Sequence, residues 1–179
     1  DFGTHIDGYI IDSAFTINLN NKYETLLTAS KDAVNTVIKN IGVDSRFQEL
    51  STIIEEVVNS YEYLDKGILK PVKIIDNLYG HNIKRWNIHG GKYLYPIKKN
   101  DDNQKVDDEE IMAIEVFVSN GDGITVLDEN VHNFSHYNLK SEFAERKIPL
   151  FQNKKLNILL DVIKDTFKTL PFCPRFINN

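Results

Sequence analysis

The stretch that most constrains this chain is residues 1–15, DFGTHIDGYIIDSAF. The dipeptide Asp7-Gly8 is typical of a β-hairpin turn, and the β-branched and aromatic residues after it favour a strand. With these two residues as the loop, Asp1 and Asp12 become diagonal neighbours on one face, about 7 Å apart at the backbone. Two carboxylates that converge in an apolar strand pair repel each other and lose hydration unless a cation joins them. The hairpin is therefore predicted to be half of a metal site.

Two further segments place chemically active side chains in unusual surroundings. The run 111–119, IMAIEVFVS, predicts a buried strand with Glu115 at its centre, where a carboxylate must be neutral, paired or metal-bound. In the segment 80–92, GHNIKRWNIHGGK, His81 and His89 share a face if the segment is extended. Two Asp, one Glu and His suit a hard-to-borderline divalent ion, or a pair of ions bridged by carboxylates.

Each of these residues also has a purely structural interpretation. Asp1 and Asp12 could be a terminal residue and a carboxylate near a turn. Glu115 could pair with a buried Lys or Arg, and a lone His such as His81 is more often a hydrogen-bonded core residue than a ligand. The residues alone leave these alternatives open.

Charge and cysteine content narrow the class of protein. The net charge of −5 and the pI near 5.5 argue against nucleic acid as a partner, because a face that binds phosphates is normally basic. A single cysteine, Cys173, excludes an internal disulfide framework and fits a reducing compartment. No apolar run approaches the roughly 18–20 residues of a membrane span. We therefore expect a cytoplasmic protein with no membrane partner.

Apolar periodicity predicts three amphipathic helices joined by strands and loops. One helix is expected over 23–41, a second is expected to open with a capping box at Ser45 and Gln48, and a third is expected over 153–170. Further expectations are a strand over 68–75 that Pro71 interrupts, a short strand or extended segment over 92–99, and an exposed acidic loop over 98–110.

Three motifs together resemble a known family: DFGTHIDGYIIDSAF, GHNIKRWNIHGGK and AIEVFVSNGDG, in this order. They are similar to the methionine aminopeptidases, and specifically to their type 2 branch, which are dinuclear metallopeptidases (M24) of the pita-bread fold. The resemblance implies an α/β (α+β) pita-bread fold with a mixed or antiparallel sheet flanked by helices. It also implies that 1–179 is a portion of a single catalytic domain, incomplete at both ends. Within it, 133–179 would be the helical insertion that separates type 2 from type 1 enzymes.

The resemblance carries over residue by residue. The implied metal ligands are Asp1, Asp12, His81 and Glu115. His89 matches a catalytic histidine that contacts the substrate, and Ile88 and His136 match residues that line the methionine pocket. The implied cofactor is a pair of divalent metal ions, for which Mn, Co, Fe and Zn are all compatible.

The implied reaction is removal of the initiator methionine from nascent polypeptides. The implied partners are the N-termini of these polypeptides at the ribosome. Metal-activated hydroxide would attack the scissile carbonyl, and His89 would donate a hydrogen bond to its oxygen. A fifth ligand of the family, a downstream Glu, has no counterpart here, so this chain alone is expected to be inactive.

Two other functions compete with this one. The first is a non-catalytic pita-bread interaction module, which has no reason to keep four ligands in a buried site. The second is a related Xaa-Pro peptidase, against which the spacing of GHNIKRWNIHGGK argues.

Overall fold

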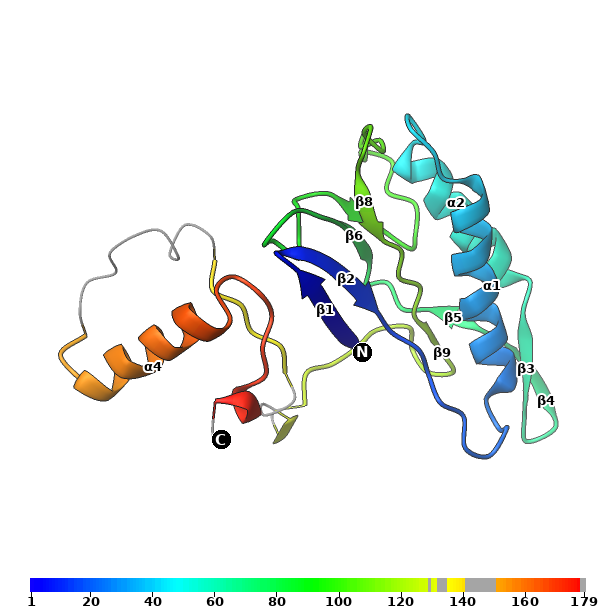
Figure 1. Cartoon of the computed structure of the whole chain (residues 1–179). Helices are drawn as coiled ribbons and strands as arrows, with labels where there is room; N and C mark the ends of the chain where they lie inside the picture. Colours follow the sequence, from blue (N-terminus) through cyan, green and yellow to red (C-terminus); the bar gives the residue numbers. More distant parts are fainter. Residues whose placement is uncertain (129, 132–134, 141–150, 178–179) are drawn as a thin grey trace. The chain divides into compact units, whose positions relative to one another are not determined.

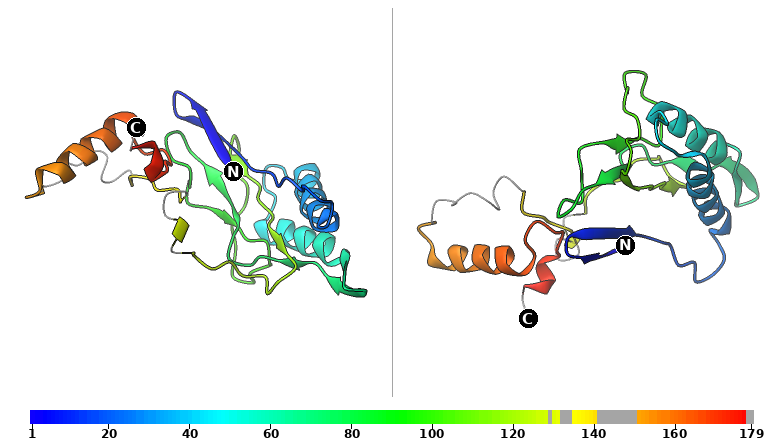
Figure 2. Two further views of the ribbon diagram at one scale, coloured as in Figure 1. Left: turned by 90° about the horizontal axis from the view of Figure 1, so that it is seen from below. Right: turned by 45° about the horizontal axis from the view of Figure 1, so that its top comes forward.

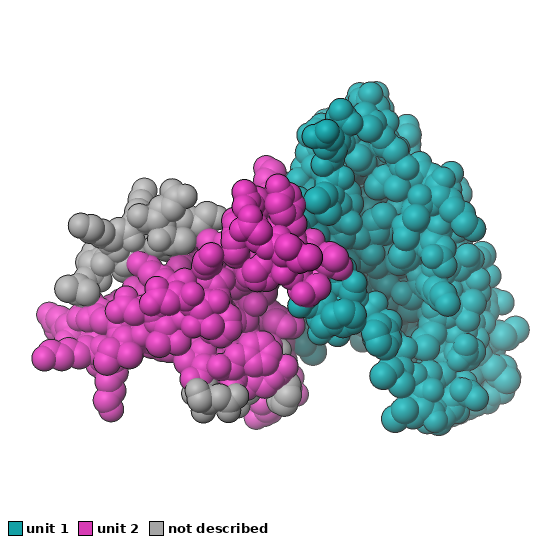
Figure 3. Space-filling model, viewed as in Figure 1, with its two compact units in different colours: residues 1–3, 12–83, 89–126 teal, residues 4–11, 84–88, 127–179 magenta. Residues whose placement is uncertain are grey.

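The computed structural model describes residues 1–128, 130–131, 135–140 and 151–177 (Figure 1). These residues divide into two compact units, coloured separately in Figure 3. Unit 1 consists of Asp1–Gly3, Asp12–Ile83 and His89–Val126, and unit 2 of Thr4–Ile11, Lys84–Ile88 and Leu127–Asn179.

The predicted hairpin at the start of the chain is confirmed. Strands β1 (Phe2–Ile6) and β2 (Tyr9–Ser13) pair with each other. The two loop residues have positive φ, 48° at Asp7 and 82° at Gly8, which is the conformation that a two-residue hairpin turn requires. The second strand ends earlier than its β-branched residues suggest, because β1 begins at Phe2 and offers no further pairing.

Two helices of unit 1 cover one side of its sheets, as both views of Figure 2 show. Helices α1 (Glu24–Asn40) and α2 (Phe47–Asn59) lie within one or two residues of the predicted positions. Their apolar stripes pack in one core with the strand residue Leu94 and with Val72 and Val116, which lie between strands. The buried helix residues are Leu26, Ala29, Ala33, Val37, Phe47, Leu50, Ile54 and Val58. Burial of a side chain such as Phe47 contributes about 1.5–3 kcal/mol.

The predicted capping box at the start of α2 is wrong. The helix has Arg46 as its N-cap residue, and its first turn receives no side-chain cap. The hydroxyl of Ser45 instead accepts the backbone N–H of Gly42, at 2.9 Å. The N–H of Phe47 is satisfied by the carbonyl oxygen of Gln104, at 3.0 Å. The backbone at Gln104 therefore takes the capping role that was predicted for the side chains of Ser45 and Gln48.

The strands of unit 1 form short antiparallel sheets. β3 (Glu62–Asp65) pairs with β4 (Ile68–Pro71), β5 (Lys73–Ile74) with β9 (Val118–Ser119), and β6 (Gly80–Ile83) with both β7 (Tyr93–Leu94) and β8 (Ile111–Ala113). The predicted break after Pro71 is confirmed, since Val72 separates β4 from β5. Helices packed on antiparallel sheets confirm the predicted α+β class.

The predicted continuous strand over 111–119 is wrong. It is divided into β8 and β9, and residues 114–117 between them are not in a strand. The division arises because the chain changes partners, pairing first with β6 and then with β5. The hydroxyl of Ser30 on α1 donates to the carbonyl oxygen of Val116 at 2.6 Å, which satisfies part of the unpaired backbone.

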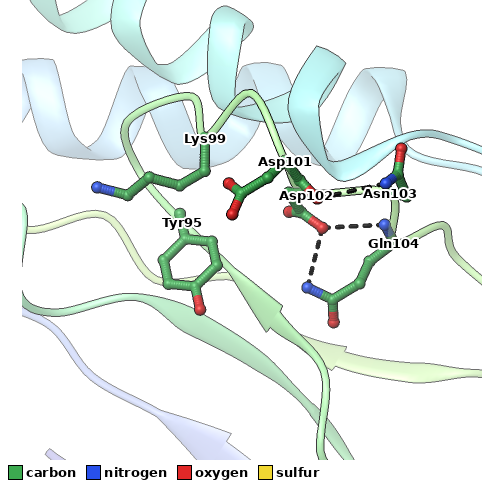
Figure 4. Close-up of a pocket in the computed structure, with 6 residues that line it drawn as sticks. All are labelled: Tyr95, Lys99, Asp101, Asp102, Asn103 and Gln104. Carbon is green, nitrogen blue, oxygen red and sulfur yellow. Dashed lines mark hydrogen bonds between the residues drawn. The ribbon is translucent and has the colours of Figure 1, made fainter.

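The acidic run 98–110 is mostly exposed, as predicted, but its backbone is ordered by local hydrogen bonds. Asp102 Oδ1 accepts both the backbone and the side-chain N–H of Gln104, at 2.9 and 3.0 Å. A pocket of about 470 Å³ opens at this loop, and none of the predicted metal ligands lines it (Figure 4). Its lining residues are Tyr95, Lys99, Asp101, Asp102, Asn103 and Gln104.

Unit 2 contains helix α4 (Lys154–Thr166) and the short 3₁₀ helix η2 (Pro174–Phe176). Asn153 caps α4 by accepting the N–H of Lys155 at 2.9 Å. The predicted helix over 153–170 ends early, and Lys168 beyond its end has a φ of 55°. Much of the predicted insertion 133–179 is described, except 133–134, 141–150 and 178–179.

Trp86 connects the segments of unit 2. Its backbone N–H donates to the carbonyl oxygen of Gly8 at 2.8 Å, and its own carbonyl oxygen accepts the hydroxyl of Thr169. The indole lies so close to Gly8 that a Cβ there would overlap it. No helix within the described ranges is long and apolar enough to cross a membrane.

Two strands of unit 1 approach each other closely at Gly80, and this yields a stability prediction. A Cβ on Gly80 would lie 2.5 Å from the carbonyl oxygen of Ala113, whereas a Cβ on Gly42 would meet nothing within 4 Å. We expect Gly80→Ala to lower the free energy of unfolding by about 1–3 kcal/mol through overpacking. The matched control Gly42→Ala should change it by less than about 1 kcal/mol. Denaturant unfolding measures both, and equal effects would contradict the close approach of β6 to β8.

Candidate metal centre

Three of the predicted ligands converge in unit 1. Asp12 on β2, His81 on β6 and Glu115 just after β8 each offer a ligand atom, and these atoms all lie within 4.8 Å of one another. His81 Nε2 is 3.1 Å from Glu115 Oε1 and 3.5 Å from Asp12 Oδ2. The imidazole is thus held between two carboxylates that come from distant parts of the sequence.

Strand register explains why His81 and Glu115 meet. His81 is the cross-strand partner of Ala113, so the two side chains lie on the same face of the sheet. Glu115 lies two residues beyond Ala113, just past the end of β8, and its Oε1 reaches His81 Nε2 from there. Glu115 is half-buried on the irregular segment between the two strands, not at the centre of a buried strand as predicted.

The charges around His81 are strongly coupled. Burial by itself lowers the pKa of His81, but hydrogen bonds to Asp12 and Glu115 oppose that effect and raise the pKa to about 9. His81 Nδ1 lies 3.2 Å from the backbone carbonyl oxygen of Asn82. Because an N–H at Nδ1 can donate to this oxygen, Nε2 is the nitrogen directed at the carboxylates. The two carboxylates therefore favour a positive charge at His81 Nε2. In the absence of metal, a proton on His81 provides that charge.

The donor set fits a divalent metal ion. Two carboxylate oxygens and one imidazole nitrogen from three separate elements form the combination that borderline divalent ions prefer. The hydrogen bond at His81 Nδ1 is the outer contact that usually orients a histidine ligand.

His89 lies beside this group. Its ring centroid is 4.4 Å from that of His81, with the two rings nearly perpendicular. Partial burial and the positive charge on His81 lower the pKa of His89. The segment between them is not extended, because the chain turns at residues 84–87 and Trp86 has a φ of 61°. The turn, and not the even spacing in the sequence, brings the two histidines together.

The remaining predicted site residues are in different surroundings. Asp1 is exposed and lies outside the three-residue group. Ile88 is buried and His136 is exposed, and both belong to unit 2. The roles assigned to these three residues remain predictions.

Residues that sequence reasoning missed surround the loop that carries His89. Asn82 is buried next to His81 and bonds to both Glu110 and the backbone of Lys92. One signal was available in the sequence: Asn82 is a polar residue between His81 and the apolar Ile83, where a side chain needs a hydrogen-bond partner.

Comparison with known proteins shows similarity over almost the entire chain. The sequence profile described as Metallopeptidase family M24 matches residues 1–136. The chain is 43% identical to methionine aminopeptidase 2 of Komagataella phaffii, over 99% of this chain and 39% of that protein. The chain is 44% identical to methionine aminopeptidase 2 of Kluyveromyces lactis, over 99% of this chain and 41% of that protein. The chain thus spans about two fifths of the length of these relatives.

Solved structures share the fold at lower sequence identity. A methionine aminopeptidase from Thermotoga maritima matches with a TM-score of 0.51 and 22% identity, over 62% of this chain and 41% of that one. A thermophilic Arx1 matches with a TM-score of 0.67 and 19% identity, over 97% of this chain and 50% of that one. The predicted pita-bread fold and the resemblance to type 2 methionine aminopeptidases are confirmed. The chain belongs to metallopeptidase family M24.

Proposed function

We propose that this chain carries the metal-binding part of a type 2 methionine aminopeptidase, which removes the initiator methionine from nascent polypeptides. The observation that carries the proposal is His81, held within 3.5 Å of both Asp12 and Glu115. The identity of 43–44% to methionine aminopeptidase 2 from two yeasts supports it.

The proposed cofactor is a pair of divalent ions, Mn, Co, Fe or Zn. Asp12, His81 and Glu115 would hold one ion, and Asp1 would join Asp12 at the second. When bound, such ions lower the pKa of a water molecule toward neutrality and polarise a carbonyl oxygen. Glu115, half-buried beside His81, would lie next to the attacking oxygen.

His89 is proposed to act on the substrate itself. Its lowered pKa keeps the imidazole neutral near pH 7, with one N–H to donate. That N–H would bind the scissile carbonyl oxygen as negative charge develops on it. Ile88 and His136 would line the pocket for the methionine side chain. The partners would be nascent N-termini at the ribosome in the cytoplasm.

The part of the chain proposed as the type 2 insertion begins near the end of the family match. The profile of the M24 family stops at residue 136, close to the predicted start at 133. Helix α4 within this part has no buried residue among those described. We propose 133–179 as this insertion.

Peptide hydrolysis by the full-length, metal-loaded protein tests the proposed function. We expect cleavage of Met-Ala-Ser but not of Ala-Pro-Ser, and loss of activity when the metal is chelated. Glu115→Gln should lower kcat by at least about a hundredfold because a ligand carboxylate is lost. The exposed residue Glu62 provides a matched control, and Glu62→Gln should leave kcat unchanged.

Three results would contradict this proposal in different ways. Cleavage of only the Xaa-Pro peptide would assign the related peptidase activity. Specific metal binding without hydrolysis of either peptide would remove the aminopeptidase assignment. The absence of both metal binding and hydrolysis would leave a non-catalytic interaction module.

Competition between metal and proton at His81 gives a pH-dependence. Because the pKa of His81 is about 9 without metal, its Nε2 is protonated at pH 7, and a metal ion must displace that proton. Apparent Mn²⁺ affinity should therefore rise about tenfold per pH unit between pH 7 and 9 and then level off. Isothermal titration calorimetry in buffers of different ionisation enthalpy should detect about one proton released from His81. An affinity that does not change over this range would contradict the coupling.

A further inference from the structure

Asn82 is almost fully buried and bonds both to the loop that follows His89, residues 90–92, and to Glu110. It is 2% exposed and follows His81 on β6. Its side-chain Oδ1 accepts the backbone N–H of Lys92 at 2.9 Å, and its backbone N–H donates to the carbonyl oxygen of Lys92 at 3.2 Å. Its carbonyl oxygen accepts the N–H of Gly90 at 2.7 Å. Asn82 thus fixes this loop at Gly90 and Lys92, which lie one and three positions after His89.

The buried carboxylate of Glu110, paired with the partly exposed Lys92, supports Asn82 from the other side. The Asn82 side-chain Nδ2 donates to Glu110 Oε1 at 2.8 Å, and the Glu110 side chain is only 7% exposed. Glu110 Oε2 accepts the ammonium group of Lys92 at 3.0 Å and the backbone N–H of Asp107 at 2.9 Å. A carboxylate this deeply buried is stabilised only if it is paired and hydrogen-bonded, and Lys92 and Asn82 provide both.

The fit between loop and anchor is tight at Gly90. A Cβ on Gly90 would lie 2.5 Å from Asn82 Oδ1 and 2.7 Å from its Cγ. Only a residue without a side chain therefore lets the loop backbone lie against the Asn82 amide. The contact explains one glycine of the pair after His89 without any reference to the metal.

We propose that Asn82, Glu110 and Lys92 form a positioning network that holds His89 at its place beside His81. The inference rests on the proposed role of His89 as a donor to the substrate carbonyl. β6 carries the ligand His81 and, at the next position, the loop anchor Asn82, so one strand fixes both histidines. The side-chain hydrogen bonds of Asn82 go to Glu110 and Lys92 and to none of the proposed ligands, so these side chains act through the position of the His89 ring, while the backbone carbonyl of Asn82 separately contacts His81 Nδ1.

Two variants of the full-length, metal-loaded protein test the network. Asn82→Ala removes the acceptor for the Lys92 N–H, and Lys92→Met leaves Glu110 without its cation. We expect each to lower kcat for a Met-peptide by about ten- to a hundredfold with little change in KM, and Lys92→Arg to recover part of the loss. The matched control is Lys99→Met, which removes a more exposed ion pair, in which Lys99 Nζ lies 3.1 Å from Asp76 Oδ1. It should leave kcat unchanged.

Close packing at Gly90 adds a test of coupling. Gly90→Ala alone should lower kcat because the new methyl group displaces the Asn82 amide. When Asn82 is already Ala, the same change should have little further effect, since the atoms it would meet are gone. Additive effects of the two substitutions would overturn the proposed contact.

Two readouts separate positioning of His89 from damage to the metal site or to the fold. The visible spectrum of the Co²⁺-loaded protein should be the same in the variants and the wild type, because the ligands are untouched. Amide hydrogen exchange at Lys92 should be faster in Asn82→Ala. A changed Co²⁺ spectrum would show that the network acts through His81 and would overturn the inference.

Failure of the inference can be distinguished from failure of the proposed function. If the wild type cleaves Met-peptides and both Asn82→Ala and Lys92→Met keep its kcat, the inference is wrong and the function stands. If the loaded wild type cleaves none, the function fails, and the catalytic role of the network fails with it. Hydrogen exchange then decides whether Asn82 holds the loop, and an unchanged Lys92 amide would refute that as well.

Discussion

The close approach of β6 to β8 at Gly80 is the constraint on which the site depends. A side chain at this position would meet the carbonyl oxygen of Ala113. Because glycine allows the approach, His81 comes within 3.1 Å of Glu115, and Asn82 reaches Glu110. The candidate metal-binding group of Asp12, His81 and Glu115 and the loop contacts of Asn82 therefore depend on the same strand pairing, and a change in its spacing would disturb both.

The two adjacent histidines are driven to opposite protonation states by their surroundings. Carboxylates raise the pKa of His81, whereas partial burial and the charge at His81 lower that of His89. A metal ion in place of the proton on His81 keeps the positive charge at the same place. His89 would then stay neutral with an N–H to donate in both states, which is what the proposed role requires.

Features set by local chemistry were predictable from the residues themselves, and the convergence of Asp12, His81 and Glu115 was predictable from the family resemblance. Other features set by distant pairing were not predictable. The Asp7-Gly8 turn was predictable because its backbone conformation depends on those two residues. Helix α1 was predictable because its helical pattern of apolar residues extends over many residues. The strand around Glu115 was predicted as continuous, yet it is divided because its two ends pair with different strands. His81 and His89 were predicted on one face of an extended segment but meet through a turn. The loop network escaped prediction because Asn82 and Glu110 come together only in the folded sheet.

Anomalous diffraction from crystals of the protein loaded with Mn²⁺ tests the central claim most directly. The account predicts a peak between the three side chains, about 2.0–2.3 Å from His81 Nε2 and from one oxygen each of Asp12 and Glu115. The peak should disappear in His81→Asn and persist in Asn82→Ala, which removes no ligand and leaves the backbone contact with His81 in place. The absence of a peak between these three side chains at saturating Mn²⁺ would contradict the metal centre itself, whether or not a second peak appears beside Asp1 and Asp12.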